Sequence, residues 1–195
     1  LGFKNLNEII GRTDLLKQVS IGTSNLDDLD LNPLLVQADP GENKRYCTSN
    51  LINRVPPTLD EKIYEDIKNS INEKNKVRSN YKIKNVHRAV GTRLSHYIFK
   101  QFGKKGIKEN TIDINLSGSA GQSLGAFGIK GLKLNVTGDA NDYVGKGLSG
   151  ATIVVKPPIE SNLVSDENTI IGNTVLYGAT SGKLFAAGQS GERFA

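Results

Sequence analysis

The chain has 195 residues, which is enough for one domain, or for one domain with a helical annex. Lys and Arg outnumber Asp and Glu by 25 to 20, but the charges are spread along the chain, so the sequence does not predict a nucleic-acid interface. No segment approaches the roughly 18 apolar residues of a membrane span, and the opening residues lack a signal-peptide pattern. Because Leu1 is not a natural start, we expect the chain to be a piece of a longer protein.

In chain order, the first half contains little glycine and is typical of helices and loops. Leu6, Ile9 and Ile10 predict a short helix that ends at Gly11. Further along, Asp39-Pro40-Gly41 predicts a turn.

The clearest helix begins at a capping box, Thr58-Leu59-Asp60-Glu61. Its apolar face is formed by residues four apart, namely Leu59, Ile63, Ile67 and Ile71. Tyr81 and Ile83 then alternate with polar neighbours and predict a strand. A second helix is predicted by the spacing of Val90, Leu94, Ile98 and Phe102, with Gly103 as its stop.

The second half is rich in glycine and contains an internal repeat with a period of about 20 residues. The two clearest copies are Ile114-Asn115-Leu116-Ser117-Gly118-Ser119-Ala120 and Leu134-Asn135-Val136-Thr137-Gly138-Asp139-Ala140. Two fainter copies contain Ile153-Val154-Val155 and Val175-Leu176-Tyr177-Gly178-Ala179. Short units of this kind cannot bury their own apolar faces, but stacked units share a core.

The sequence therefore predicts a mainly β fold, a right-handed parallel β-helix, over residues 111–195. It would be a single-stranded solenoid with about 20 residues per rung, preceded by helices and loops over residues 1–110. A β-sandwich with glycine-rich turns is the alternative. Glycine permits corners with positive φ and close backbone stacking. The glycines expected to act structurally are Gly118, Gly121, Gly125, Gly138, Gly145, Gly147, Gly150, Gly178 and Gly182.

Three short motifs match catalytic or nucleotide-binding patterns but lack the context that the chemistry needs. Residues 145–150 read G-x-G-x-x-G, yet an apparent strand follows where a helix should hold the pyrophosphate. Residues 121–125 read G-x-S-x-G, but both histidines precede Ser123, and no helix signal follows. Residues 178–183 resemble a P-loop with the wrong spacing. Tight corners are the better interpretation of the first two, and in the third Leu184 replaces the Ser or Thr that a P-loop requires.

The remaining candidates for chemistry are isolated. Asp139, Asn141 and Asp142 lack the spacing of a calcium loop and fit a turn. His87 and His96 are not spaced as a metal pair, and they are expected to be structural. Cys47, the single cysteine, forms neither an internal disulfide nor a metal cluster by itself. We therefore expect no catalytic, cofactor-binding or metal residues, and a reducing compartment such as the cytoplasm or a plastid rather than secretion.

Five longer segments carry a family resemblance. They are residues 88–96 (RAVGTRLSH), 118–127 (GSAGQSLGAF), 138–150 (GDANDYVGKGLSG), 172–182 (GNTVLYGATSG) and 191–195 (GERFA). Together they resemble the C-terminal domain of the large (α) subunit of glutamate synthase, known as the GXGXG domain. Residues 1–16 resemble the join between that domain and the preceding FMN domain.

The resemblance implies a parent enzyme that makes two glutamates from glutamine and 2-oxoglutarate, with electrons from ferredoxin or NAD(P)H. An amidotransferase domain would release ammonia, and a synthase domain with FMN and a 3Fe-4S cluster would reduce the imino intermediate. The C-terminal domain is implied to be a non-catalytic β-helix that holds these domains in position and carries no cofactor of its own.

The family domain continues through further rungs, so we expect this chain to self-associate through an open end or to fray near its last residues. Other functions remain open. They are a β-helix subunit related to the glycine-rich β-helix subunit of formylmethanofuran dehydrogenase, an enzyme using Ser123 or Cys47, and an independent ligand-binding or nucleic-acid-binding module.

Overall fold

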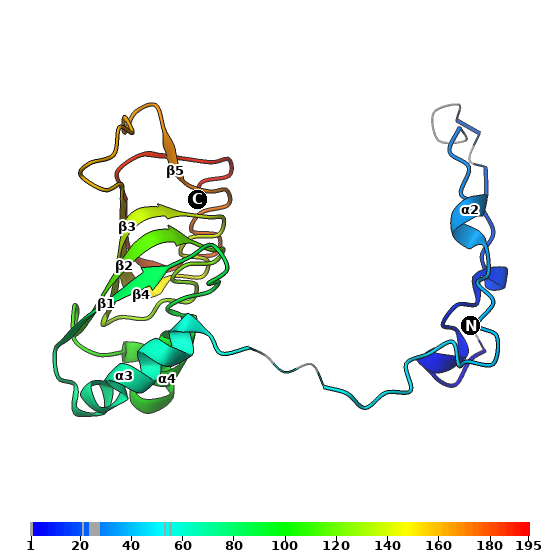
Figure 1. The fold of residues 1–195 in the computed structure, drawn as a ribbon, viewed down its shortest axis with the longest axis horizontal. Coiled ribbons are helices and arrows are strands. Elements are labelled where there is room, and N and C mark those ends of the chain that lie inside the picture. Colours follow the sequence, from blue (N-terminus) through cyan, green and yellow to red (C-terminus); the bar gives the residue numbers. More distant parts are fainter. Residues whose placement is uncertain (1, 21, 24–27, 53, 55) are drawn as a thin grey trace. The chain divides into compact units, whose positions relative to one another are not determined.

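A computed structural model describes residues 2–20, 22–23, 28–52, 54 and 56–195. The chain divides into two compact units, Leu1–Val55 and Pro56–Ala195 (Figure 1). The boundary that composition places near residue 110 stays a prediction. Among the helices of the described residues, none has both the length and the apolar character needed to cross a membrane.

The described part of the first unit contains short helical turns. They are the 3-10 helices η1 (Leu6–Glu8) and η2 (Thr13–Leu15) and the α-helix α2 (Asn32–Leu35). The helix expected to end at Gly11 is shorter, because the 3-10 turn ends where the Ile9 N–H donates to the Leu6 carbonyl at 3.1 Å. The turn predicted at residues 39–41 is confirmed, since the Gly41 N–H donates to Asp39 Oδ1 at 2.9 Å.

Both helices predicted for the second unit are confirmed. Helix α3 (Leu59–Glu73) begins after Thr58, whose hydroxyl accepts from the Glu61 N–H at 3.1 Å. Helix α4 (Thr92–Phe102) is followed at Gly103 by the 3-10 helix η3 (Gly103–Lys105). The two α-helices contact each other, with the rings of Tyr64 and Tyr97 stacked 3.7 Å apart between centroids.

The second unit also contains a seven-stranded sheet in which every strand pairing is parallel. The strands are β1 (Val77–Ile83), β2 (Ile112–Ala120), β3 (Leu132–Ala140), β4 (Ser149–Lys156), β5 (Thr169–Ile171), β6 (Ser181–Ala186) and β7 (Gln189–Ser190). Their order is β1-β2-β3-β4-β6, while β5 pairs with β3 and β7. Helices α3 and α4 lie beside β1, at one end of the row of strands (Figure 1).

The repeat in the sequence corresponds to the register of the sheet. Ile114 of β2 lies opposite Leu134 of β3, and Leu134 lies opposite Ile153 of β4. The apolar residues that alternate along these strands are fully buried and share one core with Ile63 and Leu94 of the helices. The equivalent apolar side chains of the repeat therefore build one continuous core.

The predicted right-handed parallel β-helix is wrong. The described strands form one open parallel sheet with helices between strands, which is an α/β fold, and the sheet does not close into a solenoid. The prediction rested on the repeat in the glycine-rich half alone. The sheet, however, begins with β1 in the helical half, and α4 lies between β1 and β2. The fainter copy of the repeat at residues 175–179 does not form a strand, because residues 175–178 form a turn, and β6 is the strand that pairs with β4.

Candidate interaction surface

The turn segments that follow β2, β3 and β5 are joined to one another by backbone hydrogen bonds. One residue in each has a positive φ: Ser123 at 65°, Tyr143 at 62° and Thr174 at 56°. Their N–H groups each donate to the next turn along the chain. The acceptors are the carbonyls of Asp142, Asn173 and Glu192, at 2.8, 2.9 and 2.8 Å.

Two residues further along each turn, a second set of bonds runs in the opposite direction. Gly125, Gly145 and Leu176 also have positive φ, at 66°, 66° and 60°. Their N–H groups donate to the preceding turn, where the acceptors are the carbonyls of Val90, Leu124 and Val144, at 2.8, 2.9 and 2.8 Å. We call residues 121–128, 141–148 and 172–180 with these bonds the turn ladder. Its backbone N–H groups at these positions are occupied within the protein.

The glycines expected to act structurally lie in or beside the turn ladder. All of them except Gly121 have a positive φ. A Cβ at Gly138 would collide with the carbonyl oxygen of Gly118, and a Cβ at Gly147 would lie 2.6 Å from Cδ1 of the Phe127 ring. Gly178 differs, because a Cβ there meets nothing within 4 Å. The structural role of the full set stays a prediction, and the geometry favours it most at Gly138.

The motifs that match nucleotide-binding and hydrolase patterns have the local structure of corners. Strand β4 begins at Ser149, inside the G-x-G-x-x-G match, so no helix N-terminus follows it. Residues 122–127, which contain Ser123, form turns rather than the helix that a nucleophile elbow needs. Strand β6 begins at Ser181, inside the P-loop-like segment.

The other candidate residues are distributed over the two units of the chain. His87 Nδ1 accepts from the Lys84 N–H at 3.1 Å, whereas His96 lies on α4 beside Tyr97. Cys47 is exposed and belongs to the first unit, while both histidines belong to the second.

The acidic and amide side chains of the possible calcium loop join neighbouring strands and turns. Asp139 accepts from the Ser119 hydroxyl at 3.1 Å, and Asp142 Oδ1 accepts from the Asn173 N–H at 2.7 Å. Asn141 Nδ2 donates to Asn85 Oδ1 at 3.1 Å. Within the described residues, no group of three or more His, Cys, Asp or Glu side chains is arranged to hold a metal ion.

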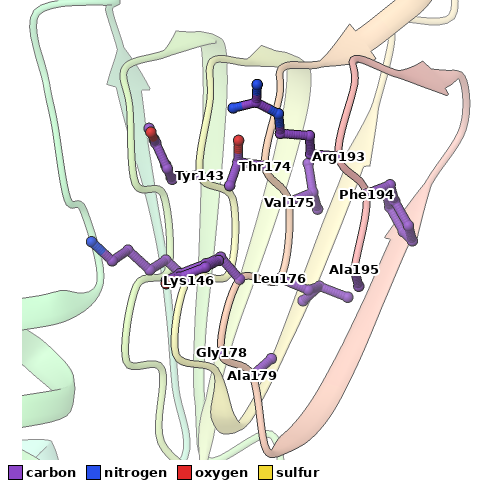
Figure 2. A pocket seen from close by; sticks show the side chains of 11 residues that line it. Tyr143, Lys146, Thr174, Val175, Leu176, Gly178, Ala179, Arg193, Phe194 and Ala195 are labelled. Atoms are coloured by element: carbon purple, nitrogen blue, oxygen red, sulfur yellow. The ribbon is translucent and has the colours of Figure 1, made fainter.

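Exposed aromatic and basic side chains project from the turn ladder. Phe127 is 56% exposed and Tyr177 63%, while Lys146 Nζ lies 5.6 Å from the ring centroid of Tyr143. Tyr143, Thr174 and Arg193 follow one another on successive turns beside a cavity of about 840 Å³ (Figure 2). Aromatic residues and Arg, though not Lys, are enriched where proteins bind partners. The turn ladder is therefore the candidate interaction surface of the second unit.

Two buried or partly buried polar arrangements were not foreseen from the sequence. The first crosses the sheet: Asn115 Nδ2 donates to Asn80 Oδ1 at 2.9 Å, and Asn135 Nδ2 donates to Asn115 Oδ1 at 3.0 Å. Beside it, Arg78 Nη2 lies 2.8 Å from Asp113 Oδ2. The repeat places Asn115 and Asn135 at equivalent positions, so this pair could have been found from the sequence.

The second is the buried carboxylate of Asp60, which caps helix α4 from the start of α3. Its two oxygens accept from the N–H groups of Gly91, at 2.9 Å, and Arg93, at 2.7 Å. Burial raises the pKa of the Asp60 carboxyl above its usual value of 3.8, and the backbone hydrogen bonds partly oppose that rise. These two hydrogen bonds join the start of α3 to the start of α4, so Asp60 serves to hold the two helices together.

Comparison with known proteins identifies the family to which this chain belongs. The model of the GXGXG motif family matches residues 60–195, and the chain belongs to that family. The matched region contains α3 from its second residue onward, all of α4, all seven strands and the turn ladder.

The relatives are glutamate synthases. The chain is 62% identical to the NADPH glutamate synthase large chain of Azospirillum brasilense over 195 residues, which is all of this chain and 13% of that protein. It is 44% identical to ferredoxin-dependent glutamate synthase 2 of Synechocystis sp. over 198 residues, again 13% of that protein. It is 41% identical to the NADH glutamate synthase of Saccharomyces cerevisiae, of which it spans 9%. The resemblance stated from the sequence is thereby confirmed.

Proposed function

We propose that this chain is a non-catalytic domain of a glutamate synthase, and that it holds the amidotransferase domain and the FMN and 3Fe-4S synthase domain in position. The observation that carries the proposal is the turn ladder. The glycine motifs that distinguish the chain contribute their N–H groups to bonds between turns, at Gly125 and Gly145 among others, rather than leaving them for a ligand. The electron donor of the parent enzyme would be ferredoxin or NAD(P)H.

The cofactors of the parent do not fit this segment. A 3Fe-4S cluster is held by cysteine thiolates, and the chain contains one cysteine. The G-x-G-x-x-G match that could cradle an FMN phosphate runs directly into strand β4. Substrate and cofactor chemistry would therefore belong to the other domains, and this chain would contribute shape and contact surface.

The proposal is tested in the whole enzyme by measuring three rates separately: glutamine hydrolysis, ammonia-dependent glutamate synthesis and glutamine-dependent glutamate synthesis. The double variant Tyr143→Ser/Tyr177→Ser removes exposed rings from the turn ladder. We expect the glutamine-dependent rate to fall several-fold while the other two stay within about twofold, because the domains would still work but would be misplaced. The proposal would be contradicted if the double variant kept all three rates of the unaltered enzyme, or if it lost all three to the same extent.

A matched control for this experiment is Phe99→Ser. Phe99 is an exposed ring on α4, 54% accessible, and it lies outside the turn ladder. This variant is expected to leave all three rates unchanged. That result would show that losing an exposed aromatic side chain does not by itself lower the glutamine-dependent rate.

A second candidate function, an independent ligand-binding module, is favoured by the cavity at the turn ladder. Lys146 and Arg193 line it, and none of its lining side chains is Asp or Glu. An anionic ligand would be expected, with 2-oxoglutarate as the probe. Calorimetry that detects millimolar or tighter binding, lost in Lys146→Ala, would support this function, and the absence of heat would exclude it for that probe.

A further inference from the structure

The first unit exposes its apolar side chains instead of burying them. None of its described residues is buried. Leu34 is 76% exposed, Leu51 90% and Ile52 89%. Leu15, Leu16 and Val36 are also exposed. By contrast, the hydrophobic core of the chain begins at Ile63, in the second unit.

Polar contacts give the first unit its local shape. Arg12 and Asp14 form a two-bond ion pair, with Nε to Oδ1 at 2.8 Å and Nη2 to Oδ2 at 2.9 Å. Gln18 bridges a second stretch of chain, since its Nε2 donates to the Leu29 carbonyl at 2.6 Å and its Oε1 accepts from the Leu31 N–H at 2.9 Å. Ordering a residue costs about 1–2 kcal/mol, and a hydrogen bond returns about 1 kcal/mol. A segment of this length without a core therefore needs another surface to stabilise it.

We propose that residues 2–20, 22–23 and 28–52 form a docking arm whose apolar side chains bind an apolar surface of another domain in the same, longer polypeptide. The proposal deepens the proposed function, on which it rests, by assigning the contact to these residues. The chain spans 13% of the Azospirillum relative, so a polypeptide of that size contains ample surface to cover the arm. Exposed apolar area of this extent on a soluble segment is typical of a protein contact.

The charge of the docking arm favours a protein surface over a polyanion. Residues 1–55 contain six Lys and Arg and seven Asp and Glu, a difference of −1. Attraction to nucleic acid or to an acidic lipid surface requires an excess of basic residues. The apolar contact is therefore the main source of binding free energy.

Limited trypsin digestion tests the proposal, because the arm contains cleavage sites after Arg12, Lys17 and Arg45. The digestion is run on the 195-residue chain alone and on the full polypeptide encoded by the gene that contains it, followed by mass spectrometry. We expect these three sites to be cut at least tenfold more slowly in the full polypeptide. Equal cleavage rates in the two proteins would overturn the proposal, as would protection in the isolated chain by self-association at higher concentration.

A pair of variants in the full polypeptide assigns the protection to the apolar side chains. Leu15→Ser/Leu16→Ser is expected to restore cleavage after Arg12 and Lys17. Leu163→Ser/Val164→Ser is the matched control, since Leu163 and Val164 are a similar exposed pair outside the arm, at 46% and 47%. It should leave the arm protected. If the two double variants behave alike, the arm is not held by Leu15 and Leu16.

The experiments distinguish failure of the docking arm from failure of the proposed function. Protection of the arm is read from cleavage rates, whereas positioning of the catalytic domains is read from the three rates of the enzyme. A protected arm with unaltered coupling in Tyr143→Ser/Tyr177→Ser would support docking and reject the role of the turn ladder. An unprotected arm with lost coupling would do the opposite.

Discussion

At the scale of single residues, glycine is required where backbone approaches backbone. Gly118 and Gly138 lie opposite each other on β2 and β3, and both have positive φ, 122° and 146°. Any Cβ at Gly138 would meet the fixed carbonyl of Gly118 rather than a flexible side chain. The strain cannot be relieved by a change of rotamer, so it must displace the strands.

We expect Gly138→Ala to lower the free energy of unfolding by about 3 kcal/mol or more, because it combines an unfavourable φ with a backbone collision. Gly178→Ala is the matched control. Its φ is 67°, but a Cβ there meets nothing, so the expected loss is about 1 kcal/mol. Urea denaturation followed by circular dichroism measures both, and equal losses would show that the collision is unimportant.

A second prediction concerns the pH dependence that Asp60 confers. Because burial raises the pKa of its carboxyl in the folded protein, the folded state binds the proton more tightly than the unfolded state does. The contribution of Asp60 to stability is therefore largest below pH 3.8, and it falls as the pH rises from 3.8 through the raised pKa of the folded state.

Asp60→Asn should remove this slope, and it should also cost about 1–3 kcal/mol at neutral pH, because the amide offers one acceptor oxygen to the two N–H donors of Gly91 and Arg93. Urea denaturation across the acid range measures both effects. Asp166→Asn, at an exposed loop position, should keep the slope of the unaltered protein. An unchanged slope in Asp60→Asn would assign the pH dependence to other groups.

Residue roles could be predicted from the sequence where they depend on near neighbours. Thr58 as a cap is such a case, since its partner is Glu61. Asp60 belongs to the same capping segment, but its partners at Gly91 and Arg93 lie about 30 positions away, and no local pattern marks them. The exposed rings of the turn ladder were likewise missed, because nothing in a repeat tells which side chains point outward at a corner.

At the scale of elements, the two helices and strands β1 to β4 follow from spacing and capping. Helix α3 combines a capped start with an apolar row, Ile63, Ile67 and Ile71, that is fully buried. The predicted fold class was wrong, because the fold class depends on the structure of the segments that lie between the strands. A spacing of about 20 residues is compatible with a β-helix, whose turn segments add further sheets, and with a single sheet whose strands they connect. Contacts between distant residues decide between these two folds.

Thr58→Ala is expected to lower the free energy of unfolding by about 1 kcal/mol, because the Glu61 N–H loses its acceptor at the start of α3. Asn69→Ala, at an exposed position within the same helix, is the control and should be neutral or slightly stabilising, since Ala has the higher helix propensity. Thermal denaturation gives the comparison. A loss in Asn69→Ala as large as that in Thr58→Ala would argue against the cap.

At the scale of the whole molecule, the open sheet leaves an edge. Strand β6 pairs with β4, and no second partner of β6 occurs among the described strands. Phe185 on this strand is 56% exposed. An exposed, apolar edge strand is a template for pairing with another chain, so the self-association expected from the sequence remains a prediction, with β6 as the contact.

Phe185→Lys is therefore expected to reduce self-association of the isolated chain several-fold, because a charged side chain disfavours edge pairing. Light scattering over a range of concentrations measures it. Phe99→Lys is matched in exposure, at 54%, but lies on α4, and it should have no such effect. A monodisperse monomer in the unaltered chain would contradict the prediction.

The connection between β4 and β5, residues 157–168, interrupts the spacing of about 20 residues that strands β2 and β3 establish. Ile114 pairs with Leu134, 20 positions on, but Ile153 pairs with Leu184, 31 positions on, and Ile159 in that connection is 95% exposed. We expect the chain to tolerate added length near Ile159, because this exposed position lies outside the strands. A reporter such as a small fluorescent protein spliced in after Ile159 would leave the strand pairing intact, whereas one residue deleted between β2 and β3 would misalign the strands that follow.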